Sequence, residues 1–157
     1  MTDLSDLYSE RILALAADIP RTQRLSAPDA TAEAHSKLCG SQIAVDLSMK
    51  DGVVTDYGQS VKACLLGQTA ASVMGHNIIG CSAAELRSVG DAMRGMLKRG
   101  GAAPTGDWAD LAVLETVRDY PQRHMSALLV FEAVEDALRQ IEGADAATSA
   151  IALDVAG

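Results

Sequence analysis

The chain has 157 residues, of which 48% are hydrophobic, and its formal net charge is −8. This length suits one domain, since domains usually contain roughly 100–150 residues, and the apolar fraction excludes a wholly disordered chain. The acidic balance argues against a nucleic-acid-binding protein, because such proteins meet phosphates with clustered Lys and Arg. The aromatic residues are one Phe, one Trp and three Tyr, so the core must consist mainly of aliphatic side chains and Met.

The three cysteines are an odd number, and Met1 is followed by the acidic residues Asp3 and Asp6 rather than by the basic start of a signal peptide. A secreted domain held by disulfides is therefore disfavoured, and reduced thiols in the cytoplasm are expected. The most apolar run, residues 125–131, is far shorter than the about 20 residues of a membrane-spanning helix. We therefore expect a cytoplasmic protein without a membrane segment.

The N-terminal residues predict one helix and a connector. Apolar residues at helical spacing between Leu4 and Leu15 indicate an amphipathic helix, which Thr2 or Ser5 could cap and which ends before Pro20. Residues 21–29 are expected to connect this helix to the next element.

From Thr31 the hydrophobic period changes to two, which predicts strands. The first strand is expected to end at Gly40, and the second covers residues 43–48. The Lys50-Asp51-Gly52 turn closes a hairpin with a third strand over residues 53–61. The pattern therefore predicts a small antiparallel sheet of about three strands.

Helical patterns follow the sheet. They cover residues 65–74 and, after a capping box formed by Ser82 and Glu85, residues 82–97. A short helix is expected over residues 108–117, and Pro121 opens a longer one. The fold class is therefore α+β, a small three-stranded antiparallel sheet packed against several helices. Residues 1–142 form a single domain, and residues 143–157 a flexible tail with little to bury.

The thiols are the most informative candidates for chemistry, because the common nucleotide-binding, metalloprotease and hydrolase motifs are absent. Cys39 lies at the predicted end of the first strand, and Cys64 lies where the third strand gives way to a helix. Backbone polar groups and the helix dipole can stabilise a thiolate at such boundaries. The alternative for each cysteine is a small buried hydrophobe, which is the interpretation that we adopt for Cys81.

Three segments resemble the U-type iron–sulfur cluster scaffold family, which includes IscU, SufU and the N-terminal domain of NifU. They are Cys39-Gly40, the helix start 64–74, and residues 114–123 with the pattern Leu-Glu-x-Val-x-Asp-Tyr-Pro-x-Arg. The resemblance covers about residues 5–141, and residues 82–112 are most similar to the SufU branch. It implies an α+β scaffold fold of the SufE/IscU kind that accepts sulfur from a cysteine desulfurase and holds zinc or a nascent [2Fe–2S] cluster.

The resemblance also implies site residues. Cys39 and Cys64 match two family cysteines that bind the metal or cluster, but the Asp position holds Ser41 and the third Cys position holds Ser126. Thiolate, imidazole and carboxylate are the usual zinc ligands, and cluster irons take thiolates. A serine hydroxyl is a poor substitute for either.

Several groups could complete such a site. His124 is predicted as a third metal ligand if the last helix starts late, and Met125 and His35 are alternatives. A homodimer could instead pool two cysteines from each copy. Arg123 matches a family arginine and is expected to orient ligands or a persulfide.

Three functions therefore remain open. The first is a scaffold or sulfur acceptor that is not an enzyme, with Cys64 as the persulfide acceptor and with a cysteine desulfurase and apo iron–sulfur proteins as partners. The second is a metal-free paralogue that acts as an interaction module for a desulfurase or cluster target. The third is a redox switch through a Cys39–Cys64 disulfide, which requires Cα atoms within about 7 Å.

Overall fold

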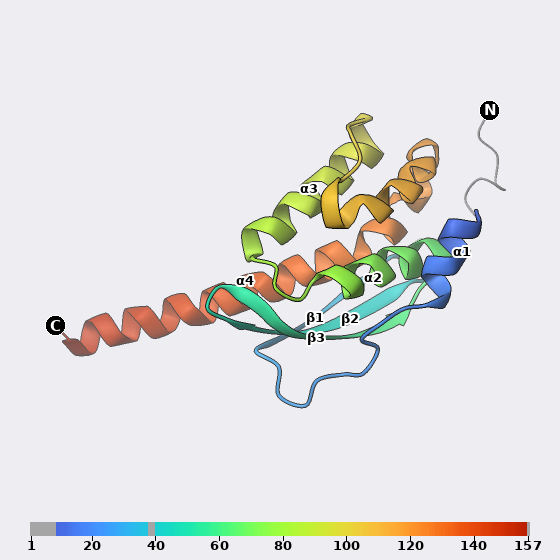
Figure 1. The fold of residues 1–157 in the computed structure, drawn as a ribbon. Helices are drawn as coiled ribbons and strands as arrows, with labels where there is room; N and C mark the ends of the chain where they lie inside the picture. Colours follow the sequence, from blue (N-terminus) through green and yellow to red (C-terminus); the bar gives the residue numbers. More distant parts are fainter. Residues whose placement is uncertain (1–8, 38–39, 157) are drawn as a thin grey trace.

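The computed structural model describes residues 9–37 and 40–156, with side chains as far as residue 144. Figure 1 shows a small sheet with helices on one side, and this confirms the α+β fold. The elements in chain order are α1 (Glu10–Ala17), β1 (Ala30–His35), β2 (Gln42–Lys50), β3 (Val53–Lys62), α2 (Leu65–Asn77), α3 (Ala83–Arg99), the 3₁₀ helices η2 (Gly106–Asp119) and η3 (Pro121–Arg123), and α4 (His124–Ala156).

The three strands form an antiparallel sheet in the order β1-β2-β3, as the sequence predicts. The central strand places Val45 between Ala32 of β1 and Gln59 of β3. Between β2 and β3, Asp51 and Gly52 have φ values of 55° and 83°. A two-residue hairpin turn with positive φ at both positions matches the right-handed twist of the strands, which explains why Asp-Gly stands there.

The helices cover one face of the sheet (Figure 1). Helix α4 packs against β1 and β2, α2 packs against β3 and α4, and α3 and η2 form a further layer above them. Inward-facing side chains of the strands and helices make one core, which includes the fully buried Val45, Leu66, Met93 and Phe131. No helix in the described part of the chain is long and apolar enough to cross a membrane.

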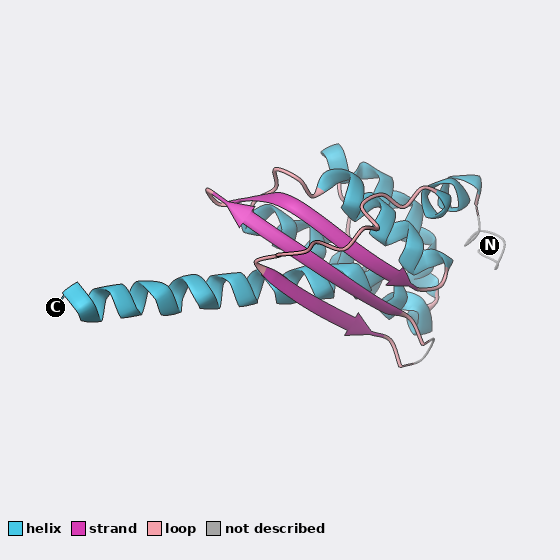
Figure 2. Ribbon diagram, turned by 90° about the horizontal axis from the view of Figure 1, so that it is seen from below, coloured by secondary structure: helices cyan, strands magenta, loops and turns pink. Residues whose placement is uncertain are grey.

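The connector between α1 and β1 crosses the opposite face of the sheet (Figure 2). Alternation in β2 would leave Asp46 facing solvent, yet its side chain is only 2% exposed. The Arg24 guanidinium donates to both Asp46 oxygens at 2.6 and 2.8 Å, and the Leu25 N–H and the Thr31 hydroxyl donate at 3.0 and 2.7 Å. The Arg24 guanidinium is the main reason that the pKa of Asp46 falls to about 2.

A second buried polar contact joins the connector to β3 and α2. The Gln59 side chain is fully buried. Its Nε2 donates to the carbonyl oxygens of Pro20 and Ala71, at 3.1 Å each, and its Oε1 accepts a hydrogen bond from the Tyr57 hydroxyl at 3.0 Å. Burial is the main reason that the pKa of Tyr57 is raised. Because each partner belongs to a different element or turn, this amide fixes α2 relative to the sheet.

The predicted helix start at Ser82 is confirmed. The Ser82 hydroxyl accepts a hydrogen bond from the Glu85 N–H at 3.2 Å, which satisfies one of the free donors of the first turn. The first helix instead begins after Ser9, whose hydroxyl accepts from the Ile12 N–H. The predicted caps Thr2 and Ser5 lie outside the described residues.

Two boundaries and one helix type differ from the predictions. Strand β1 ends at His35 rather than at Gly40, because the chain turns there with the Gly40 N–H on the Ser36 carbonyl. Residues 106–119 form a 3₁₀ helix instead of a short α-helix. Helix α4 continues to Ala156, past the expected domain end near residue 142, and its last turns project beyond the body (Figure 1). Flexibility of this tail stays a prediction.

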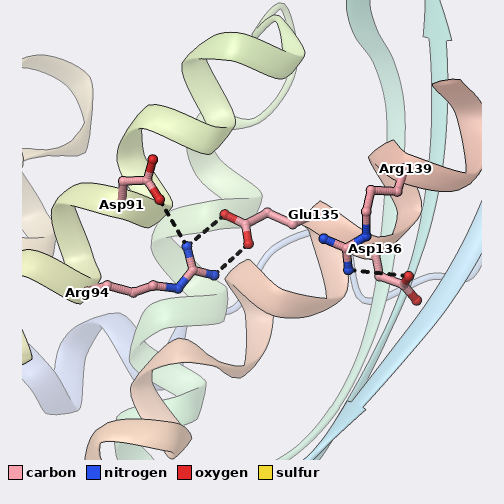
Figure 3. A network of polar contacts seen from close by, with 5 residues as sticks. All are labelled: Asp91, Arg94, Glu135, Asp136 and Arg139. Carbon is pink, nitrogen blue, oxygen red and sulfur yellow. Dashed lines mark hydrogen bonds and ion pairs between the residues drawn. The ribbon is translucent and has the colours of Figure 1, made fainter.

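An ion pair joins α3 to α4 (Figure 3). Both guanidinium NH groups of Arg94 donate to the Glu135 carboxylate, and these side chains are only 24% and 13% exposed. Gly90 leaves room for this contact, because a Cβ there would collide with Glu135 Oε1. The nearby pair of Asp136 and Arg139 is 46% and 64% exposed.

The Arg94–Glu135 pair is expected to contribute more to stability than the exposed pair. A double-mutant cycle with Arg94→Met and Glu135→Gln should give a coupling energy of about 1–2 kcal/mol, because the pair is bidentate and partly desolvated. The same cycle on Asp136 and Arg139 should give below about 0.5 kcal/mol. Urea unfolding of each variant measures both energies, and equal couplings would contradict this prediction.

Candidate functional site

The predicted position of Cys64 at a helix start is confirmed. Strand β3 ends at Lys62, and Cys64 is the N-cap residue of α2, with extended backbone angles (φ −66°, ψ 172°). The residue is half-buried, and its thiol is free. A helix N-terminus presents backbone N–H groups and the positive end of the helix dipole, which favour a bound anionic group there.

Ser41 lies beside Cys64. The Ser41 hydroxyl accepts a hydrogen bond from the Cys64 backbone N–H at 3.3 Å, and the residue is only 3% exposed. The turn before β2 places it there, since the Ser36 N–H donates to the Ser41 carbonyl and Gly40 adopts a φ of 71°. The predicted ligand Cys39 lies outside the described residues, although it directly precedes Gly40 in this connection.

Ser126 approaches the same end of α2 from α4. The residue is 2% exposed, and its carbonyl oxygen is 3.1 Å from the position that a Cβ on Gly67 would take. That position is also in contact with Ala63, the residue before Cys64. The structure therefore brings Ser41, Cys64 and Ser126 to the N-terminus of α2, as the family resemblance implies. We call these three residues the α2 site.

Arg123 ends the short η3 helix, one turn before Ser126. Arg123 therefore lies at the junction of η3 and α4, three residues before Ser126. The Arg123 Nε atom is buried and has no hydrogen-bond partner among the described residues. A buried donor of this kind usually has an acceptor, which an anionic group could supply.

His124 has a different position from the one its predicted role needs. Helix α4 already begins at His124, so its side chain and that of Ser126 point about 200° apart around the helix axis. Its Nε2 lies 3.0 Å from the Arg118 carbonyl oxygen, and the residue is 8% exposed. This contact joins the start of α4 to η2. A role for His124 as a metal ligand stays a prediction.

The interpretation of Cys81 as a buried residue is confirmed. It is 7% exposed, and its thiol donates a hydrogen bond to the Asn77 carbonyl at 3.2 Å. Burial, followed by the charge of Glu85, raises the pKa of Cys81 to about 11. A thiol of this kind is unreactive at neutral pH, so Cys81 serves as a matched control for Cys64.

Gly67 is the residue of this region that sequence reasoning missed. It lies in the first turn of α2, where glycine destabilises a helix. A glycine in a predicted helix is therefore the sequence signal that could have identified this position. A Cβ at this position would lie 2.7 Å from the Ala63 Cβ and 3.1 Å from the Ser126 carbonyl oxygen, so glycine is what fits there.

The comparisons with known proteins agree on one family. The chain is 54% identical to a nitrogen-fixing NifU-like protein (N-terminal) from Brucella abortus, with a TM-score of 0.87 over 89% of this chain and 97% of that structure. The chain belongs to the U-type iron–sulfur cluster scaffold family. It is also 28% identical over 135 residues to the iron–sulfur cluster assembly scaffold protein IscU of Thermotoga maritima, covering 86% of this chain and 94% of that protein.

A second solved structure shares the fold. It is a putative iron–sulfur cluster assembly scaffold protein for the SUF system from Fervidobacterium islandicum AW-1, with 20% identity and a TM-score of 0.78 over 87% of this chain and 99% of that one. No protein-family model matches the chain. Among the described residues of this U-type protein, no group of three or more His, Cys, Asp or Glu side chains is placed to hold a metal ion.

Proposed function

We propose that this U-type protein accepts sulfur at Cys64 for iron–sulfur cluster assembly and is a carrier rather than an enzyme. The observation that carries the proposal is the free, half-buried thiol of Cys64 at the N-terminus of α2, within the α2 site. The membership of the scaffold family supplies the class of process. Cys39 and Cys64 are the two residues that we propose to bear sulfur or iron.

The sulfur transfer needs no oxidant or reductant. The Cys64 thiolate attacks the outer sulfur of a persulfide on a cysteine desulfurase, so that a new sulfur–sulfur bond forms on Cys64 and the bond within the donor persulfide breaks. The donor cysteine leaves as a thiolate. The helix N-terminus stabilises the anionic sulfur before and after transfer, and we propose that the buried Nε of Arg123 orients it.

The partners follow from this role. A cysteine desulfurase supplies the sulfur, and apo iron–sulfur proteins receive the assembled [2Fe–2S] cluster, which is cargo of the scaffold. The net charge of −8 favours basic surfaces on these partners through electrostatic steering. We expect the exchange to take place in the cytoplasm, where thiols stay reduced.

Replacing Cys64 is expected to abolish sulfur uptake. The parent chain and its Cys64→Ser and Cys81→Ser variants are incubated anaerobically with a cysteine desulfurase and free cysteine, and intact-mass spectrometry then detects a gain of one sulfur atom per chain. The parent and Cys81→Ser should gain it, because Cys81 is buried away from the donor. Cys64→Ser should not, and Arg123→Gln should gain it more slowly.

Sulfur uptake by Cys64→Ser equal to that of the parent would contradict the proposal. Mapping the modified peptide then shows whether Cys39 accepts the sulfur in place of Cys64. Circular dichroism of each variant confirms that a loss of uptake does not come from unfolding.

A second candidate function is a metal-free interaction module for the same partners, which the hydroxyls of Ser41 and Ser126 favour. In this case the chain would bind a desulfurase with unchanged affinity after Cys64→Ser and would gain no sulfur in any variant. The mass measurement above separates the two functions.

A further inference from the structure

We infer that Ser41 and Ser126 do not act as metal ligands, so that one copy of this chain does not hold a four-coordinate metal ion. The inference concerns the α2 site of the proposed function. It restricts which metal ion or cluster a single copy of the chain binds tightly. It rests on the contacts of the two serines and on the chemistry of their side chains.

The Ser41 hydroxyl already has a structural role. It accepts the Cys64 backbone N–H at 3.3 Å and is 3% exposed, so it satisfies a donor at the helix N-terminus that would otherwise be buried unpaired. An aspartate at this position would bring a carboxylate, which is a zinc ligand. The neutral hydroxyl is not one of the donors that zinc sites use.

Ser126 is held in place by packing. Its backbone carbonyl lies against Gly67, and the residue is 2% exposed, so the start of α4 packs closely against the first turn of α2. Relative to the family pattern, a hydroxyl stands at this position where a thiol is expected. The loss concerns the donor atom and not the fold.

The remaining soft ligands are too few. Within the described residues, Cys64 supplies the single thiolate of the α2 site, and Cys39 adds at most a second one. Structural zinc takes four Cys, His or carboxylate ligands, and the irons of a [2Fe–2S] cluster together take four. No group of three or more His, Cys, Asp or Glu side chains among the described residues is placed to hold a metal ion, so two thiolates would leave the other positions to water, small thiols or a second protein.

Zinc alone tests this inference without a desulfurase. The affinity for Zn²⁺ is measured by competition with a chromophoric chelator for the parent, the Ser41→Ala and Ser126→Ala variants, Ser41→Asp, and the double variant Ser41→Asp/Ser126→Cys. The two alanine variants should stay within about 100-fold of the parent, since the loss of an outer-shell partner costs about 10–100-fold. The double variant should gain more than about 100-fold, which exceeds an outer-shell effect.

X-ray absorption at the zinc edge gives an independent readout, because Zn–S bonds of about 2.3 Å are longer than bonds to oxygen or nitrogen. The double variant should add one sulfur to the zinc shell of the parent. If Cys at position 126 disturbs the packing against Gly67, Ser41→Asp alone changes the donor set without touching α4 and should still raise the affinity.

A loss of more than about 100-fold in either alanine variant would overturn the inference, because it would exceed an outer-shell effect and the hydroxyl would then act as a ligand. Parent affinity equal to that of the double variant would overturn it as well. These outcomes are separate from the proposed function. If the parent takes up sulfur at Cys64 and also binds zinc tightly, the inference is contradicted and the proposed function is not. If the parent binds zinc weakly and takes up no sulfur, the proposed function is contradicted and the inference is not.

Discussion

At neutral pH, replacing Asp46 with Asn is expected to lower the free energy of unfolding by about 2–4 kcal/mol. The carboxylate accepts four hydrogen bonds, two of them from Arg24. An amide in its place keeps one acceptor oxygen but puts an NH₂ group against the donors of the other oxygen, which are then left unpaired on a buried face of β2. Urea unfolding measures the loss, and the exposed Asp136→Asn variant is the control, with a change below about 0.5 kcal/mol.

The effect of Asp46→Asn should shrink in acid. The pKa of Asp46 is lowered from its ordinary value of 3.8 to about 2 in the folded protein, so the ionised carboxylate favours folding at all pH values above the ordinary one. This contribution is lost as the pH falls from about 4 through 2. It amounts to about 1–2 kcal/mol, because Arg24 is partly solvated and solvent screens the pair.

Urea unfolding at pH 7, 4 and 2.5 tests this dependence. The difference in the free energy of unfolding between the parent and Asp46→Asn should stay constant from pH 7 to about 5 and become smaller below pH 5. A difference that does not change between pH 7 and 2.5 would show that the carboxylate charge is not what stabilises this contact.

Replacing Gln59 with Leu is expected to cost about 3–5 kcal/mol, which is a large share of the roughly 5–15 kcal/mol that stabilises a domain. Leucine has a similar size, so little volume changes. The Pro20 and Ala71 carbonyls lose a donor, and the buried Tyr57 hydroxyl loses its acceptor. Buried polar groups left unpaired cost about 1–3 kcal/mol each.

Two variants serve as controls for Gln59. Gln122 is exposed in η3, and Gln122→Leu should change stability by less than about 0.5 kcal/mol. Tyr57→Phe removes a single donor and should cost about 1–2 kcal/mol. If the free energy of unfolding of Gln59→Leu lies within about 1 kcal/mol of that of the parent, the amide does not hold the connector, β3 and α2 together.

The local parts of the fold could be predicted from the sequence. The hairpin follows from Asp51 and Gly52, whose positive φ values suit the turn, and the start of α3 follows from Ser82 and Glu85. Each of these signals lies within four residues of the structure that it specifies. The 3₁₀ conformation of η2 has no such signal, because its hydrophobic spacing resembles that of a short α-helix.

The second buried face of the sheet could not be predicted. Asp46 alternates with apolar residues along β2, a pattern typical of a strand with one solvent-exposed face. Its partner Arg24 lies in a connector 22 residues away, and no local pattern joins the two. The burial of Gln59 escaped prediction for the same reason, since Pro20 is 39 residues away.

The candidate site was predictable to different degrees. The element boundary places Cys64 at a helix start without reference to any relative. The approach of Ser41 and Ser126 depends on contacts between segments distant in sequence, and only the family resemblance indicated it. The start of α4 at His124 decides the direction of that side chain, and no local sequence signal marks this residue as the helix start.

The hairpin turn between β2 and β3 is a suitable attachment point for immobilising or labelling this protein. Strand β2 runs from Gln42, next to Ser41, to Lys50, next to the turn, so nine residues at about 3.3 Å each separate the two ends by about 30 Å. A surface tether, affinity tag or dye inserted at Asp51 and Gly52 would therefore leave the cysteine end unobstructed. Immobilised in this orientation, every molecule would present Cys64 to incoming partners.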